Sequence, residues 1–192
     1  MQLIIGISGA SGVIMGYEML KVLRQVPDCE IHLVYTEGAS RNFIYETSID
    51  IVNLEKLADF VYDNKNLAAS ISSGSFKTDG MIIIPCSMKT VAGIVAGYAD
   101  NLLLRAADVC LKEGRRVVLV PRELPLSSIH LRNLKELADY GCIIVPPMLT
   151  FYNNSDTVDK QVQHVIGKVL MQFGIQHKQF IAWKGHDGNE DI

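Results

Sequence analysis

Small and hydroxyl-bearing residues break a buried apolar run near the amino terminus, at residues 6–12 (GISGASG). Residues 3–7 are typical of a buried strand, and the apolar spacing over 13–23 predicts a helix. Such a turn points unpaired backbone N–H groups at one place, where the helix dipole favours an anion. The turn is therefore a candidate phosphate site, although Ser8 stands where the dinucleotide fingerprint G-x-G-x-x-G has a glycine. A plain turn in which Ser8 or Ser11 caps the helix fits the same residues.

Polar side chains also follow two later apolar runs. Residues 87–90 (SMKT) offer two hydroxyls, a lysine and the N–H groups of a helix start, which suit a phosphate or a polar ring. Arg122 and Glu123 come directly after residues 117–121, where they could clamp a phosphate and serve as an acid or base. The alternatives are an ordinary helix cap at Ser87 and a local ion pair at Arg122.

The elements that must position these residues alternate between strand and helix. Strands are expected at 3–7, 31–35, 81–85, 117–121 and 142–145, and helices at 13–23, 36–47, 51–61, 86–95, 101–113, 127–141 and 157–173. Each strand is a continuous apolar run, which is typical of a parallel sheet covered on both faces. Ligands of such folds bind beyond the carboxyl ends of the strands, so the polar residues there, Thr36 included, should converge. The Ser- and Gly-rich segment 68–80 is expected to be a loop over that site.

Composition excludes several classes of protein. The chain has 192 residues and a net charge of −3, so nucleic acid, which binds basic surfaces, is not expected as a partner. No apolar run is long enough to span a membrane, and no signal peptide is expected. The four cysteines are far apart and mostly lie in apolar runs, which predicts buried thiols in a cytoplasmic protein. Cysteines and histidines lack metal-ligand spacing, so no metal site is expected.

Further candidates have an ordinary explanation when they are taken alone. Arg105 and Lys112 lie on the narrow polar stripe of an apolar helix. They could pair with Asp108 or bind an anion at a subunit junction. The others would be solvated, packed or capping side chains by position alone: Glu46, His130, Tyr152 and Lys168.

With these positions in place, the chain resembles the UbiX-type flavin prenyltransferases, which include the B subunits associated with hydroxyarylic acid decarboxylases. The resemblance runs from residue 3 to about residue 183. It is carried by GISGASG (6–12), ET (46–47), AASISSGSF (68–76), IIPCSMKT (83–90), RAADVCLKEGRR (105–116), VPRELPLSSIHL (120–131), PPMLTFYN (146–153) and Trp183. It implies a single Rossmann-like domain over 1–183, with three α/β/α layers and a mostly parallel sheet, and a polar tail at 184–192.

The resemblance also implies an activity. Members of the family bind FMN and join the dimethylallyl group of dimethylallyl monophosphate to N5 and C6 of reduced FMN. No metal is required, and the prenylated FMN is handed to a UbiD-type decarboxylase. The family forms large homo-oligomers, typically dodecamers, and the same assembly is expected here.

Carried over residue by residue, the resemblance implies three groups of site residues. The flavin site comprises Gly9, Ala10, Ser11, Thr36, Ser87, Met88, Lys89, Thr90 and Arg122. The prenyl phosphate is met by Tyr152 and Lys168, assisted by Arg105 and Lys112, some of them from neighbouring subunits. Ser11, Glu46 and Glu123 match the family's proton-handling group. Thr36 and Lys168 stand where other members carry Ser and Arg, and they keep the hydroxyl and the charge.

Three alternatives belong to other classes of protein. An FMN-dependent cysteine decarboxylase shares the fold, but its P-x-M-N segment is not matched, because residues 146–149 read PPML. A non-catalytic B subunit of a hydroxyarylic acid decarboxylase complex is disfavoured, because a binding partner would not need the full set of Ser11, Glu46, Glu123, Tyr152 and Lys168. An NAD-linked oxidoreductase is disfavoured by Ser8 in the glycine turn.

Overall fold

The computed structural model describes residues 1–183 and 185, in two compact units, Met1–Pro147 and Met148–Ile192. The expected polar tail at 184–192 lies outside the described residues, residue 185 excepted. None of the helices in the described ranges is long and apolar enough to cross a membrane.

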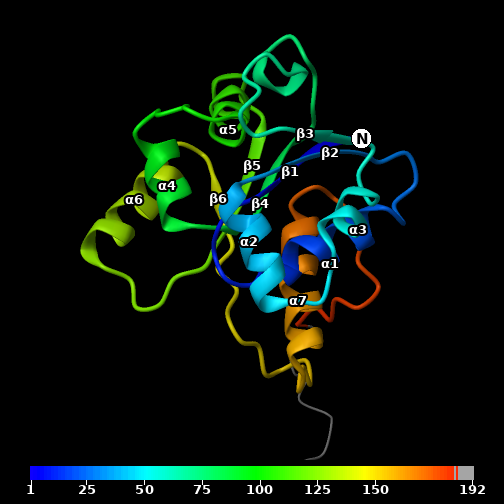
Figure 1. Cartoon of the computed structure of the whole chain (residues 1–192). Helices are drawn as coiled ribbons and strands as arrows, with labels where there is room; N and C mark the ends of the chain where they lie inside the picture. Colours follow the sequence, from blue (N-terminus) through cyan, green and yellow to red (C-terminus); the bar gives the residue numbers. More distant parts are fainter. Residues whose placement is uncertain (184, 186–192) are drawn as a thin grey trace, which may run out of the picture. The chain divides into compact units, whose positions relative to one another are not determined.

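The first unit holds a sheet of six parallel strands in the order β3-β2-β1-β4-β5-β6 (Figure 1). The strands are β1 (Gln2–Ile7), β2 (Glu30–Tyr35), β3 (Phe60–Tyr62), β4 (Gly80–Cys86), β5 (Arg116–Pro121) and β6 (Ile143–Ile144). This is the strand order of the Rossmann fold. The central strands β1 and β4 are buried along almost their whole length, as expected for a sheet covered on both faces. The predicted Rossmann-like α/β fold is confirmed.

Helices cover both faces of this sheet. Figure 1 shows α4 (Met88–Val95), α5 (Leu102–Lys112) and α6 (Ser128–Asp139) on one side, and α1 (Ile14–Leu23), α2 (Glu37–Glu46) and α3 (Ile51–Glu55) on the other. On the first side, Ile83 and Leu119 of the sheet share a buried cluster with Leu103 of α5. On the other side, α1 packs directly on the sheet at Gly16, where a Cβ atom would lie 2.7 Å from the carbonyl oxygen of Ile84.

The segment 51–61 differs from its prediction as one helix. Helix α3 ends at Glu55, and Phe60 begins the edge strand β3 beside β2. Asp59 explains the change, because its N–H donates to the carbonyl of Ile31 (3.0 Å) and its carboxylate accepts from the N–H of Ile31 (2.8 Å). These two bonds start the β pairing that the apolar spacing alone could not reveal. Because of this pairing the sheet has a sixth strand, and the residues that follow β3 lie at a further carboxyl end of the sheet.

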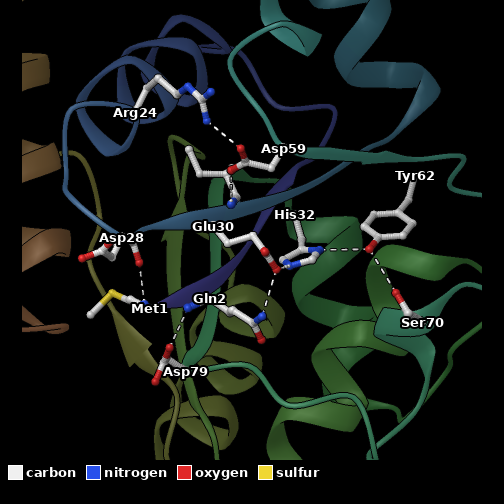
Figure 2. A network of polar contacts seen from close by, with 11 residues as sticks. Met1, Gln2, Arg24, Asp28, Glu30, His32, Asp59, Tyr62, Ser70 and Asp79 are labelled. Carbon is white, nitrogen blue, oxygen red and sulfur yellow. Dashed lines mark hydrogen bonds and ion pairs between the residues drawn. The ribbon is translucent and has the colours of Figure 1, made fainter.

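A buried histidine ties the edge of the sheet together at the amino-terminal part of β2 (Figure 2). The His32 ring contacts the Tyr62 hydroxyl at 2.9 Å and the Glu30 carboxylate at 2.8 Å. Tyr62 in turn lies 3.0 Å from the Ser70 hydroxyl, in the 3₁₀ helix η1 (Ser70–Ser72). Both ring nitrogens of His32 therefore have partners, as a buried polar side chain requires.

The Ser- and Gly-rich segment 68–80 packs against α5, and its residues do not line the cavity described below. Arg105 donates from Nε to the carbonyl of Ser72 (3.1 Å), and Arg115 donates to the carbonyls of Gly74 and Phe76 (both 2.7 Å). The segment does not line this cavity, because Arg105 of α5 and Arg115, just after that helix, hold its carbonyls instead.

The second unit contains α7 (Val158–Met171), close to its predicted bounds. The Thr157 hydroxyl caps it by accepting from the N–H of Lys160 (3.3 Å). Phe180 packs onto this helix at Gly167, where a Cβ atom would lie 2.5 Å from the Cβ of Phe180.

Candidate functional site

The strand order places a crevice at the carboxyl ends of β1 and β4. The chain runs from β1 to β2 on one side and from β4 to β5 on the other, so the loops after β1 and β4 diverge there. This is the switch point at which open α/β sheets bind ligands. The carboxyl end of β1 holds both neighbouring loops. Its Ile7 carbonyl accepts from the N–H of Thr36 (3.0 Å), and its Ser8 hydroxyl accepts from the N–H of Ser87 (2.7 Å).

Two helices begin at this crevice with hydroxyl caps. Thr36 caps α2 by accepting from the N–H of Ala39 (3.2 Å), and Ser87 caps α4 by accepting from the N–H of Thr90 (3.2 Å). Four backbone N–H groups in these first turns have no hydrogen-bond partner among the described residues. They belong to Glu37, Gly38, Met88 and Lys89. Two adjacent helix starts with unused N–H groups are a ready anion site.

A cavity of about 730 Å³ opens between these helix starts, within the usual range for a small-molecule site. One part of its lining comes from Gly9, Thr36, Gly38, Ser87, Lys89 and Thr90. The β1 turn and the α2 start touch there without side chains between them, since a Cβ atom on Gly9 would lie 3.1 Å from the Cα of Gly38. The backbone is thereby brought to the surface of the cavity.

The other part of the lining was missed by sequence reasoning. It comes from Tyr35, Asp63, Asn64, Lys65, Asp100 and Asn101, and the lining is completed by Glu37, Ser40 and Leu104. Residues 63–65 follow β3. The apolar spacing predicts a helix over 51–61 instead of this strand, so it does not indicate that residues 63–65 follow a strand end. Asn64 also braces the start of α5, because its side-chain oxygen accepts from the N–H of Leu103 (2.9 Å). An asparagine in a polar run carries no sequence signal for this long-range contact.

Tyr35 contributes a neutral ring to the cavity wall. Its hydroxyl donates to the Glu55 carboxylate at 2.5 Å. Burial and this hydrogen bond raise the pKa of Tyr35 to about 12, so the phenol keeps its proton at neutral pH.

A second group of candidates surrounds the turn after β1. The Glu46 carboxylate, at the end of α2, accepts from the N–H groups of Gly12 (2.7 Å) and Val13 (3.4 Å). Arg122, just after β5, donates from Nε to the carbonyl of Ser11 (3.2 Å). Residues far apart in the sequence, Ser11, Glu46 and Arg122, are thus brought to one turn.

Glu123 follows Arg122, and its carboxylate accepts from the N–H of Leu124 (3.1 Å). Ser11, Glu46 and Glu123 are all exposed in the single chain. Of the predicted flavin-site residues, Ala10, Ser11, Met88 and Arg122 do not line the cavity; Ala10 and Met88 are mainly core side chains at 8% exposure.

Arg105 and Lys112 lie on α5 and do not line the cavity. The guanidinium of Arg105 also donates to Asp108 (2.6 Å), whereas Lys112 pairs with Glu113 and not with Asp108. Helix α5 starts beside the cavity and rises about 1.5 Å per residue, so Lys112 lies at its far end, roughly 16 Å along the axis from Asn101. Lys112 is therefore far from the cavity of its own chain, whereas Arg105 directly follows Leu104, which lines it.

The second unit brings Tyr152 and Lys168 onto one pair of stacked rings. The rings of His164 and Phe180 stack with their centroids 5.0 Å apart. Tyr152 meets the His164 ring edge-on at 5.8 Å, and Lys168 Nζ lies 5.3 Å from the centroid of Phe180. Burial and the charge of Lys168 both lower the pKa of His164, which keeps this imidazole neutral.

The strand order and a cavity between two helix starts define a Rossmann-like α/β protein of the nucleotide-binding class. The family model described as Flavoprotein matches residues 1–173. A probable UbiX-like flavin prenyltransferase of Sedimentibacter hydroxybenzoicus is 67% identical over 185 residues, which cover 96% of this chain and 98% of the relative. The chain belongs to the UbiX-like flavin prenyltransferases within the flavoprotein family.

Solved structures agree with this assignment. A dodecameric FMN-dependent UbiX-like decarboxylase from Escherichia coli O157:H7 superposes with a TM-score of 0.95 at 53% identity, over 96% of this chain and 100% of that one. AnUbiX (PadA1), in complex with FMN and dimethylallyl pyrophosphate, gives a TM-score of 0.94 at 41% identity, over 97% and 98%. The FMN-dependent cysteine decarboxylase TvaF is only 17% identical, with a TM-score of 0.62, and shares the fold alone.

Proposed function

We propose that this protein transfers the dimethylallyl group of dimethylallyl monophosphate to N5 and C6 of reduced FMN, and that a UbiD-type decarboxylase receives the product. The observation that carries the proposal is the cavity between the starts of α2 and α4, in a chain 67% identical to a probable flavin prenyltransferase. We further propose that residues 1–183 act as one flavoprotein domain, which the family match across both units supports.

The donor set of the cavity fits the phosphate of FMN. Four unused N–H groups and the ammonium of Lys89 supply positive potential, while the hydroxyls of Thr36, Ser87 and Thr90 supply hydrogen bonds. The turn at Gly9, Ala10 and Ser11 would meet the flavin ring system, with Arg122 holding the turn through the Ser11 carbonyl. Reduced FMN supplies the two nucleophilic atoms of the reaction.

Ser11, Glu46 and Glu123 would move the protons of the reaction. N5 loses its proton as it bonds to the dimethylallyl group and the phosphate leaves; when the remaining alkene then bonds to C6, the alkene gains one proton and C6 loses one. The Glu46 carboxylate is held on the turn after β1 by the N–H of Gly12, and Glu123 follows Arg122, which donates to the Ser11 carbonyl of the same turn, so a proton acceptor could be held near the flavin edge. The oxygens of the departing phosphate are a second possible acceptor, and the variants of Glu123 described below separate the two.

Tyr152, Lys168, Arg105 and Lys112 would bind the prenyl phosphate. A phosphate leaves as a dianion, so three cations and a phenol hydroxyl would lower the barrier to its departure. In this proposal these groups take the place of a metal ion. Lys112 is remote from the cavity of its own chain, and Arg105, although it follows the lining residue Leu104, does not line it, which supports their service to a neighbouring copy in a homo-oligomer, in the manner of the dodecameric relative.

Assembly would also protect the reaction. An allylic electrophile is destroyed by water, and Ser11, Glu46 and Glu123 are exposed in the single chain. A neighbouring copy would cover them in a homo-oligomer, which we propose is a dodecamer. We propose the cytoplasm as the location, because Cys29, Cys86, Cys110 and Cys142 are all free thiols.

The proposed function is tested by supplying the purified protein with reduced FMN and one of two donors, dimethylallyl monophosphate or dimethylallyl pyrophosphate. We expect phosphate release and flavin modification in equal amounts with the monophosphate. Faster modification with the pyrophosphate, the compound bound to AnUbiX, would overturn the choice of donor. Decarboxylation of a hydroxyarylic acid by the chain alone, without flavin modification, would favour the decarboxylase alternative.

A further inference from the structure

We infer that Ser8 is the positioning residue of the flavin phosphate site, acting through the start of α4. The inference rests on the proposed function and adds to it a residue that touches no ligand. Ser8 is completely buried at the carboxyl end of β1, and its hydroxyl donates to the carbonyl of Pro85 (3.1 Å) while accepting from the N–H of Ser87 (2.7 Å). The serine thus joins the two central strands at the switch point.

The two helix starts depend on β1 in different ways. Helix α2 is held by the backbone, through the bond from the Thr36 N–H to the Ile7 carbonyl. Strand β4 is also joined to β1 by backbone, because the N–H of Ser8 donates to the carbonyl of Pro85 (3.1 Å), but the first residue of the α4 start is held by a side chain, since the Ser87 N–H donates to the Ser8 hydroxyl. Replacing that hydroxyl leaves a half-buried N–H unsatisfied and removes the side-chain bond that fixes Ser87, while the backbone bond between Ser8 and Pro85 stays. The phosphate-facing N–H groups of Met88 and Lys89 move with Ser87.

The customary phosphate site of this fold is already occupied. Dinucleotide-binding proteins place a pyrophosphate at the helix that follows β1. Here the Glu46 carboxylate takes the N–H groups of Gly12 and Val13 at the start of α1. A phosphate there would have to displace Glu46 from these N–H groups. At the starts of α2 and α4 the N–H groups of Glu37, Gly38, Met88 and Lys89 have no partner among the described residues, and the carboxylate of Glu37 pairs with Arg41. A serine at position 8 therefore fits a protein whose phosphate site lies on α4 rather than α1.

Two flavins that differ only in the phosphate test this role. Riboflavin lacks the phosphate of FMN, so dissociation constants for both separate phosphate binding from ring binding. We expect Ser8→Ala to weaken FMN binding about tenfold, the scale of one lost hydrogen bond to a group that faces a charge, and to change riboflavin binding less than about twofold. Ser8→Thr keeps the hydroxyl and should restore the preference for FMN.

The control is Ser70→Ala, which removes one hydroxyl from the Tyr62 contact at the edge of the sheet. It should leave the ratio of the two dissociation constants unchanged. If Ser8→Ala proves too unstable to purify, Ser8→Cys keeps the volume with a weaker donor and should give a smaller loss confined to FMN. Equal losses for both flavins, or none, would overturn the inference. Failure of the wild-type protein to modify FMN would instead overturn the proposed function.

Discussion

The carboxylate of Glu46 accepts a hydrogen bond of 2.7 Å from the backbone N–H of Gly12, joining the last residue of α2 to the turn after β1. Val13, the residue before α1, provides no side-chain cap, so this carboxylate from another helix serves instead. Glu46 therefore has a structural task in addition to the proposed proton transfer.

Variants of Glu46 separate the two tasks. Glu46→Gln keeps an oxygen that can accept from Gly12 but cannot take a proton, whereas Glu46→Ala loses both functions. We expect Glu46→Gln to melt within a few degrees of the wild type and to lose about 100-fold in turnover, the scale of general acid–base catalysis. Glu46→Ala should also be less stable. Full turnover by Glu46→Gln would show that the carboxylate only caps the turn.

Glu123→Gln tests the second carboxylate. We expect it to bind FMN normally, because the carboxylate accepts from the N–H of Leu124 and an amide oxygen can do the same, and to lose about 100-fold in turnover. Asp139→Asn, which removes an exposed carboxylate paired with Lys135, is the matched control. Unchanged turnover in Glu123→Gln would assign the C6 proton to the departing phosphate.

Lys168→Ala should act on the prenyl substrate. Removal of a cation that faces a phosphate should raise the KM for dimethylallyl monophosphate about tenfold or more and leave the dissociation constant of FMN unchanged. Lys160→Ala, on the same helix and paired with Asp156 at 2.6 Å, should change neither value. Weaker FMN binding in Lys168→Ala would mean that this lysine belongs to the flavin site.

The same variant should change the pH dependence of stability. Because the pKa of His164 in the folded protein is lowered, by burial first and Lys168 second, the neutral ring is favoured by folding. Its contribution to the free energy of unfolding is complete above about pH 6.5 and is lost as the pH falls below that value. Melting temperatures should therefore fall between pH 7 and pH 5.

Lys168→Ala should make that fall smaller, because one of the two causes of the lowered pKa is gone. A nuclear magnetic resonance titration of the His164 ring should show a higher pKa in this variant. A His164 pKa that is lower or unchanged in Lys168→Ala would contradict the effect of Lys168 on this histidine.

The sequence predicted the parallel sheet and most helix bounds, because apolar runs and caps are local signals. Thr36, Ser87, Ser127 and Thr157 all cap helices where such residues are expected. Even His130 has the capping role expected from its position, since its Nδ1 accepts from the N–H of Ser127 (3.3 Å).

The features that the sequence did not predict, the edge strand β3 and part of the cavity wall, depend on contacts between distant segments. The pairing of Asp59 with Ile31 makes β3, and with it the part of the cavity wall at 63–65, yet neither residue signals the other in the sequence. In the sequence, Ser8 is a departure from the dinucleotide fingerprint G-x-G-x-x-G. In the structure, its hydroxyl joins two strands through Pro85 and Ser87. The resemblance named the site residues, but their roles stay predictions for the variants above.

The mass of the flavin product tests the central claim most directly. The protein, reduced FMN and dimethylallyl monophosphate are mixed without oxygen, and the flavin is released by denaturation and measured by mass spectrometry. The account predicts a flavin heavier than FMN by one C5 unit, formed by the wild type and strongly reduced in Glu46→Gln. Recovery of unmodified FMN alone, with both substrates bound, would contradict it.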